Sequence, residues 1–138
     1  MAESAKHIAL LTKLLQYVRA SASETLHLSV LHDLPGLIGC DKPPKLGAYR
    51  PDLYATDAPT TRVIVGEAKT TLDLETSHSR QQLLSFLRHL ALYPGSTLVV
   101  AVPWAARVRA KELLRKLREE TNSQHTHLVV IDDIEELA

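Results

Sequence analysis

Three ionisable residues stand at the ends of two short apolar segments of this 138-residue chain. Asp52 opens the segment 52–55, while Glu67 and Lys69 follow the β-branched run at residues 63–66. Side chains alternate between the two faces of a strand, so Glu67 and Lys69 are expected on the same face. If the two strands pair, Asp52 lies beside Glu67. Two adjacent carboxylates repel each other, and a divalent cation with a preference for oxygen ligands, Mg²⁺ or Mn²⁺, would relieve the repulsion.

Pro51 and Asp52, followed by Glu67 and Lys69, resemble the motif of the PD-(D/E)XK nuclease superfamily, which includes many restriction endonucleases and Holliday-junction resolvases. The resemblance implies a metal-dependent endonuclease that hydrolyses phosphodiester bonds in DNA, with Mg²⁺ as cofactor and Mn²⁺ as a substitute. It also implies that Asp52, Glu67 and the backbone carbonyl of Ala68 bind the metal. Lys69 would orient the attacking water.

A role for Lys69 as a general base would require a lowered pKa, because an ammonium with a pKa near 10.4 is a poor base. Two non-catalytic interpretations stay open. In one, Glu67 forms an ion pair with Lys69 or Arg50 that stabilises an α/β domain without activity. In the other, the chain is a catalytically inactive nuclease-fold module that binds DNA or protein. The complete set of Asp52, Glu67 and Lys69 favours catalysis, whereas the zero net charge and short length favour an inactive module.

Many members of the superfamily carry a further acidic residue on the first helix. In this chain Glu3 stands at the start of the first expected helix, and Glu24 stands just after its end. Neither residue lies well inside the helix. Of the two, Glu24 is our candidate for an additional metal ligand, and the number of metal ions, one or two, stays open.

Residues 32–49 are rich in proline and glycine, which predicts a long loop. Loops of this length in a compact domain are uncommon and often have a function. The loop carries Lys42 and Lys45 and leads through Arg50 to Asp52. It is either a phosphate-binding loop beside the metal site or a solvated connection.

Residues 79–82 have the form of a capping box, which predicts a helix from Ser79 that ends near Tyr93. Arg80 projects on the apolar side of this helix, at its sheet-facing start. Its guanidinium would contact either a phosphate of the nucleic acid or, in a structural role, Asp73 or Glu75.

The same helix also resembles one branch of the superfamily. Gln82 and Phe86 are similar to the Gln-x-x-x-Tyr element of RecB-like nucleases, which implies that Gln82 contacts the substrate or the site. This chain has phenylalanine where that element has tyrosine, which puts membership of the branch in doubt. Gln81 is the alternative candidate for the same role.

The remaining apolar patterns predict an α/β fold with the element order α-β-β-β-α-β-α-β, in a single domain over residues 1–138. The expected helices and strands cover residues 3–21, 26–31, 52–55, 62–69, 79–93, 96–102, 105–121 and 128–131. Short or loop connections allow an antiparallel meander of the first three strands, and helical crossovers favour parallel addition of the last two. The prediction is a mixed five-stranded sheet with helices on both faces, which is also the restriction-endonuclease-like fold that the resemblance implies.

The chain has 16 Lys and Arg residues and 16 Asp and Glu residues, so its formal net charge is zero. A global basic field of the kind that attracts nucleic acid is therefore absent, although a local basic patch would suffice. The basic helix at residues 105–121 is either a second nucleic-acid surface or a solvated face. One cysteine, Cys40, permits no intrachain disulfide and indicates the cytoplasm. No apolar run reaches the roughly eighteen residues of a membrane span.

The resemblance implies DNA as the binding partner. It also implies a homodimer, because members of the superfamily often cut both strands of DNA as dimers. The candidate dimer surfaces are the loop at residues 32–49 and an exposed edge of the sheet.

Overall fold

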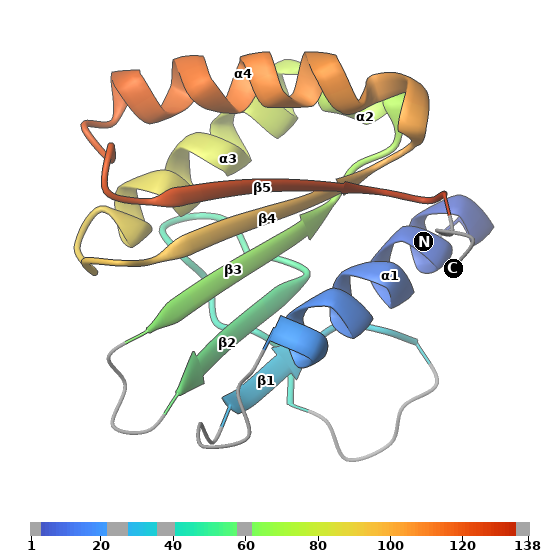
Figure 1. Cartoon of the computed structure of the whole chain (residues 1–138), viewed down its shortest axis with the longest axis horizontal. Helices are drawn as coiled ribbons and strands as arrows, with labels where there is room; N and C mark the ends of the chain where they lie inside the picture. Colours follow the sequence, from blue (N-terminus) through green and yellow to red (C-terminus); the bar gives the residue numbers. More distant parts are fainter. Residues whose placement is uncertain (1–3, 22–27, 36–40, 58–61, 135–138) are drawn as a thin grey trace.

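The computed structural model describes residues 4–21, 28–35, 41–57 and 62–134. The elements follow the predicted order, with a short helix and a 3₁₀ turn in addition (Figure 1). They are α1 (Ala5–Ser21), β1 (Leu28–His32), β2 (Leu53–Asp57), β3 (Val63–Ala68), α2 (Thr71–Leu74), α3 (Ser77–Leu90), β4 (Thr97–Val102), η1 (Trp104–Ala106), α4 (Arg107–Glu120) and β5 (His127–Asp132). Glu3, Glu24 and Cys40 lie outside the described residues.

The strands form a mixed sheet in the order β1-β2-β3-β4-β5 within the described part of the chain. β1, β2 and β3 are antiparallel neighbours, while β3, β4 and β5 run parallel. Figure 1 shows α3 and α4 on one face of the sheet and α1 on the other. The predicted fold class, a five-stranded mixed α/β sheet covered on both faces, is therefore confirmed.

The two central strands are buried on both faces, which explains why their sequences are continuous apolar runs. Val63 and Val65 of β3 pack against α3 and α4, whereas Ile64 and Ala68 pack against α1. The alternation of side chains along β3 therefore divides one short segment between two hydrophobic cores. It also places Glu67 on the face of α3 and α4.

α1 packs close to β3 because Gly66 has no side chain. A Cβ atom at Gly66 would lie 2.9 Å from Cδ2 of Leu14, which is shorter than any normal contact. The buried stripe of α1 has the three- and four-residue spacing of an amphipathic helix, and its members are Leu10, Leu11, Leu14, Leu15 and Val18. This packing directs the first turns of α1 toward the end of β3 that carries Glu67.

α3 begins earlier than the capping pattern predicted. Its N-cap is Thr76, whose side-chain oxygen accepts a hydrogen bond from the backbone N–H of Ser79 at 3.1 Å. The predicted N-cap, Ser79, is instead a buried residue inside the helix. Thr76 offers the same hydroxyl chemistry three residues upstream, so the helix gains nearly a turn. α2 lies in the connection between β3 and α3.

Candidate active site

Asp52 and Glu67 lie side by side where β2 and β3 stop pairing. Leu53 and Gly66 form the last pair of the antiparallel ladder, so Asp52 comes one residue before β2. The backbone N–H of Asp52 donates to Oε2 of Glu67 at 3.3 Å, and the N–H of Ala68 donates to Oδ2 of Asp52 at 2.8 Å. Each carboxylate therefore holds the backbone of the opposite strand, which fixes the position of both acids.

Lys69 lies on the same face as Glu67, as the alternation of a strand requires. Its Nζ is 3.7 Å from Oε1 of Glu67, and it donates a hydrogen bond to Oε1 of Gln82 on α3. Only 4% of Glu67 and 7% of Lys69 is exposed to solvent. A buried charge is costly unless it is paired, so Gln82 and Glu67 together hold the ammonium in place.

The carbonyl oxygen of Ala68 faces the side of β2, where Asp52 lies. The N–H of Lys69 donates to the carbonyl of Ala101 on β4 at 2.9 Å. Because successive peptide groups of a strand face opposite neighbours, the N–H and carbonyl of Ala68 face β2. The ladder with β2 has ended at this level, and the N–H of Ala68 bonds the side chain of Asp52 instead. The main-chain oxygen is thus available beside Asp52.

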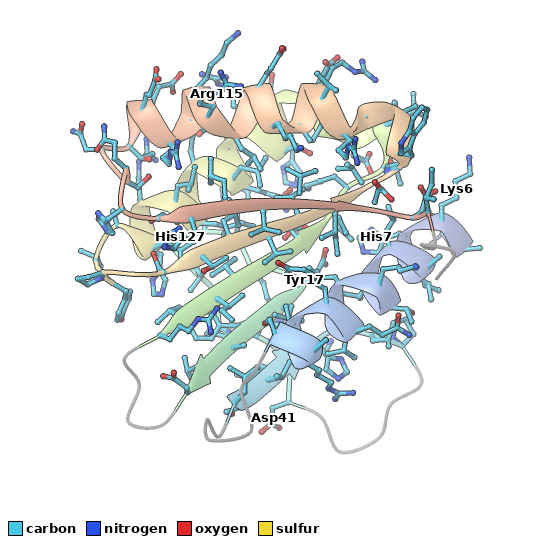
Figure 2. All side chains as sticks on the ribbon, viewed as in Figure 1. Lys6, His7, Tyr17, Asp41, Arg115 and His127 are labelled. Atoms are coloured by element: carbon cyan, nitrogen blue, oxygen red, sulfur yellow. The ribbon has the colours of Figure 1, made fainter. Side chains whose placement is uncertain are left out.

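α1 contributes His7, which we did not identify from the sequence. Nε2 of His7 lies 3.7 Å from Oδ1 of Asp52. Figure 2 shows His7 near the start of α1, close to the carboxyl ends of β3 and β4. The spacing of His7 to Leu10 and Leu11 places it on the buried stripe of α1. That spacing is the signal in the sequence that indicates an inward position for His7.

The two carboxyl groups have opposite pKa shifts. Burial raises the pKa of Asp52, but the nearby His7 and the hydrogen bond from the N–H of Ala68 outweigh burial and leave the pKa below its ordinary value. Burial, together with the nearby charge of Asp52, raises the pKa of Glu67 well above its ordinary value, and Lys69 only partly opposes this. Without a cation the pair therefore resists ionisation of both carboxyl groups, and Glu67 is the one that ionises at the higher pH.

The oxygen atoms of Asp52, Glu67 and the Ala68 carbonyl suit Mg²⁺ better than a metal ion whose ligands all come from protein side chains. Within the described ranges, no group of three or more His, Cys, Asp or Glu side chains is arranged to hold a metal ion. Mg²⁺ requires less, because it keeps several water ligands and is commonly bound by one or two carboxylates together with a substrate phosphate. Asp52, Glu67 and the Ala68 carbonyl supply two carboxylates and one neutral oxygen.

The described part of the loop before Asp52 packs against α3. Leu46 is buried, Tyr49 contacts the ring of His78 at a centroid distance of 5.5 Å, and a Cβ atom at Gly47 would lie 3.0 Å from Oγ of Ser85. Gly47 has a φ of 69°, which a glycine adopts without strain. This packing places the loop on the side of the site that Gln82 also approaches.

The basic side chains proposed for nucleic-acid contact divide into two groups. Lys42, Lys45 and Arg50 are exposed on the loop that leads to Asp52, and Lys42 lies 3.9 Å from Asp33. Arg80 instead pairs with Glu120 at the end of α4. The structural partner that the sequence indicated for Arg80, Asp73 or Glu75, is therefore wrong. Contacts between α3 and α4 bring Glu120 to Arg80, and no local pattern encodes them.

Comparisons with known proteins identified no family for this chain. A scan against protein-family models, a search of curated proteins and a search of solved structures each returned no significant match. No helix among the described residues is long and apolar enough to cross a membrane. The functional interpretation therefore depends on the geometry of the site and on the resemblance carried by Pro51, Asp52, Glu67 and Lys69.

Proposed function

We propose that this chain is a Mg²⁺-dependent deoxyribonuclease of the PD-(D/E)XK type, which hydrolyses phosphodiester bonds in DNA and accepts Mn²⁺ in place of Mg²⁺. One observation carries the proposal. At the carboxyl end of β3, Glu67 lies in contact with both Asp52 and Lys69. The side chains of Glu67 and Lys69 are almost completely buried. Carboxyl groups with shifted pKa values next to a buried lysine are typical of functional sites. Two adjacent buried carboxyl groups repel each other, and this repulsion does not stabilise a fold.

Asp52, Glu67 and the Ala68 carbonyl would hold the metal. When bound, the ion neutralises charge on the phosphate and lowers the pKa of a bound water. The chain itself supplies orientation: the backbone hydrogen bonds at 2.8 and 3.3 Å fix both carboxylates. His7 holds Asp52 from the side of α1.

Lys69 has the geometry of a residue that orients water. An ammonium has three N–H donors, and two of them are directed to Gln82 and Glu67. The third donor would hold the attacking water or a phosphate oxygen. Gln82 fixes the direction of this donor, because its own position is set by α3. Lys42, Lys45 and Arg50 would bind phosphates on either side of the scissile bond.

A second candidate function is a catalytically inactive module with the same fold that binds DNA or protein. The observation in its favour is that Lys69 and Glu67 already form an ion pair and that Gln82 satisfies the ammonium. Such a network is complete without a metal. The two candidates differ in one measurable property, which is metal-dependent cleavage.

The deciding experiment is cleavage of a substrate panel with Mg²⁺, Mn²⁺ or EDTA. The panel contains supercoiled plasmid, linear duplex, single-stranded DNA and a four-way junction. Asp52→Asn removes the charge that the metal needs. Asp57→Asn is the matched control, because Asp57 is a buried acid at the other end of the same strand and accepts the N–H of Arg62 at 3.0 Å.

We expect metal-dependent cutting by the wild type and by Asp57→Asn, and none by Asp52→Asn. If the wild type cuts no substrate and calorimetry detects no Mn²⁺ binding, the inactive module is the correct function. If Asp52→Asn cuts like the wild type, the assigned site is wrong.

A further inference from the structure

The outer edge of β5 carries unused backbone hydrogen-bonding groups. The N–H of His127 donates to the carbonyl of Ser96 at 2.8 Å, so the peptide groups of Val129 and Ile131 also face β4. Those of Leu128, Val130 and Asp132 face outward. No strand of the described chain pairs with this side of β5. An open edge of this kind is a template for pairing with another chain.

Two hollows with mixed polar and apolar linings lie beside β5 on the side of α1. α1 packs mainly on β3 and β4, so it leaves the outer part of β5 uncovered. One hollow of about 690 Å³ is lined by Tyr17, Trp104 and Ile131, and Arg107 and Asp132 also reach it. A second hollow of about 450 Å³ is lined by Tyr17 and Val129, and Arg118 also reaches it. Tyr17 is 39% exposed and Trp104 is 56% exposed. Apolar side chains of an added strand would fill these hollows.

The opposite face of the same edge is basic. Nη1 of Arg107 lies 3.4 Å from Oδ2 of Asp132, and Nη1 of Arg118 donates to the carbonyl of Thr126 at 3.3 Å. These contacts identify the side of α4 that lies above β5. At 100° per residue, the exposed side chains of Lys111 and Arg115 project from the same side. We call these four residues, Arg107, Lys111, Arg115 and Arg118, the basic side of α4.

We propose that the outer edge of β5 binds an extended acidic segment of a partner protein, which adds to the sheet as a sixth strand. The side chains of a strand alternate between its faces. Acidic residues of the segment would therefore lie under the basic side of α4, while the intervening apolar residues enter the hollows beside Tyr17. Main-chain pairing supplies affinity in such complexes, and the alternating side chains supply specificity. The proposal does not depend on nuclease activity.

Two other occupants of this edge, a second copy of the chain and nucleic acid, fit the structure less well. A second copy paired through β5 would bring two basic sides of α4 together, and like charges in contact are unfavourable. Nucleic acid would satisfy the basic side. However, it would leave the outward peptide groups of Leu128 and Val130 without hydrogen-bond partners and the exposed rings of Tyr17 and Trp104 without apolar contacts. An acidic strand would pair with the outward peptide groups of β5, place side chains in the hollows and neutralise the basic side of α4.

The test uses a fluorescent peptide of alternating Glu and Val, about eight residues long, which matches an ordinary strand. Binding is measured by anisotropy at physiological salt. The first control peptide has Lys in place of Glu. The second is N-methylated at alternate residues, so that it keeps its charge but cannot donate to the edge. We expect the Glu-Val peptide to bind and both control peptides to bind at least about tenfold more weakly.

Two protein variants separate charge from strand pairing. Lys111→Glu together with Arg115→Glu should weaken binding of the peptide by about tenfold or more. Lys116→Glu is the matched control, because Lys116 is exposed on the opposite side of the same helix. Val130→Pro removes an outward N–H without removing a bond to β4, so it should abolish binding while circular dichroism stays unchanged.

Amide hydrogen exchange provides a readout that does not depend on any variant. The bound peptide should slow exchange at Leu128, Val130 and Asp132, whose N–H groups face outward. Equal binding of the N-methylated peptide would overturn the proposal. So would dissociation of a β5-linked dimer by Val130→Pro, which would assign the edge to a second copy. Complete competition by duplex DNA, without slowed exchange at Val130, would assign the surface to nucleic acid.

Discussion

Two buried polar clusters lie at opposite ends of the central strands. The hydroxyl cluster comprises Ser96, Ser123 and Thr126, all fully buried just before β4 and β5. Oγ of Ser96 donates to the carbonyl of Leu90 at 2.9 Å and lies 3.0 Å from Oγ1 of Thr126. The carboxylate cluster comprises Asp52, Glu67 and Lys69, at the carboxyl end of β3. One cluster is neutral and the other is charged.

We expect the buried hydroxyl groups to stabilise the fold and the buried carboxyl groups to destabilise it. A hydroxyl loses little when it leaves water for a hydrogen bond inside the protein. A carboxyl group in the same position has a raised pKa, as Glu67 does through burial and the charge of Asp52. Natural proteins keep such conflicts mainly at functional sites, where activity compensates for lost stability. The comparison therefore predicts that the two clusters respond in opposite ways to mutation.

The largest expected effect is on catalysis. If the proposed function is correct, Lys69→Ala should lower the rate of DNA cleavage by about 10²–10⁴, because it removes the donor that we propose orients the attacking water. The equivalent truncation in the hydroxyl cluster, Ser96→Ala, should leave the rate unchanged. The measurement is single-turnover cleavage of the best substrate with Mg²⁺. Full activity of Lys69→Ala would show that the buried ammonium has only a structural role.

The second effect is the pH dependence of metal binding. Since the pKa of Glu67 is raised, the metal must displace a proton from it, and binding should weaken as the pH falls. Below the raised pKa we expect about a tenfold loss of Mn²⁺ affinity per pH unit. Calorimetry in two buffers of different ionisation enthalpy measures the released proton directly. Binding without proton release would mean that Glu67 is already ionised or is not a ligand.

The third effect concerns stability in the hydroxyl cluster. Ser96→Ala should lower the free energy of unfolding by about 1–2 kcal/mol, because the buried Thr126 hydroxyl and Leu90 carbonyl lose a partner. Urea unfolding measures the change. Thr121→Ser, a smaller change at the half-buried hydroxyl next to Ser123, is a control that keeps the hydrogen bond. A stabilised Ser96→Ala protein would contradict the view that this cluster supports the fold.

The sequence was sufficient for the parts of the site that depend on strands. Alternation along β3 places Glu67 and Lys69 on one face, and the apolar runs identify both strands that meet at Asp52. The element order and the mixed sheet followed from the same short-range patterns and from the lengths of the connections. These features are local, so a single sequence encodes them directly.

The parts that depend on contact between helices were not predictable in the same way. His7 reaches Asp52 only because Gly66 lets α1 approach β3 closely. Arg80 pairs with Glu120, forty residues away, because α3 and α4 pack side by side. Helical periodicity states which face of a helix is buried, but it does not state which neighbour that face meets. That choice is made by packing of the whole domain.

The smallest expected effect is a gain in stability, and it is the most direct test of the difference between the two clusters. Glu67→Gln should abolish cleavage but stabilise the metal-free protein by about 1 kcal/mol near pH 8, or roughly 2–4 °C. The amide has a similar shape and can still accept the N–H of Asp52, while the buried charge is removed. Thermal unfolding in EDTA over a pH series measures the difference in stability.

The sign of the pH dependence follows from the raised pKa of Glu67. The folded wild type binds more protons than the unfolded chain between the unfolded pKa, about 4.3, and the raised value, so its stability falls as the pH rises through that window. The advantage of Glu67→Gln should therefore vanish near pH 4, where Glu67 is protonated. Added Mg²⁺ should stabilise only the wild type. A variant that is less stable than the wild type at pH 8 would place the carboxylate cluster, like the hydroxyl cluster, among the groups that support the fold.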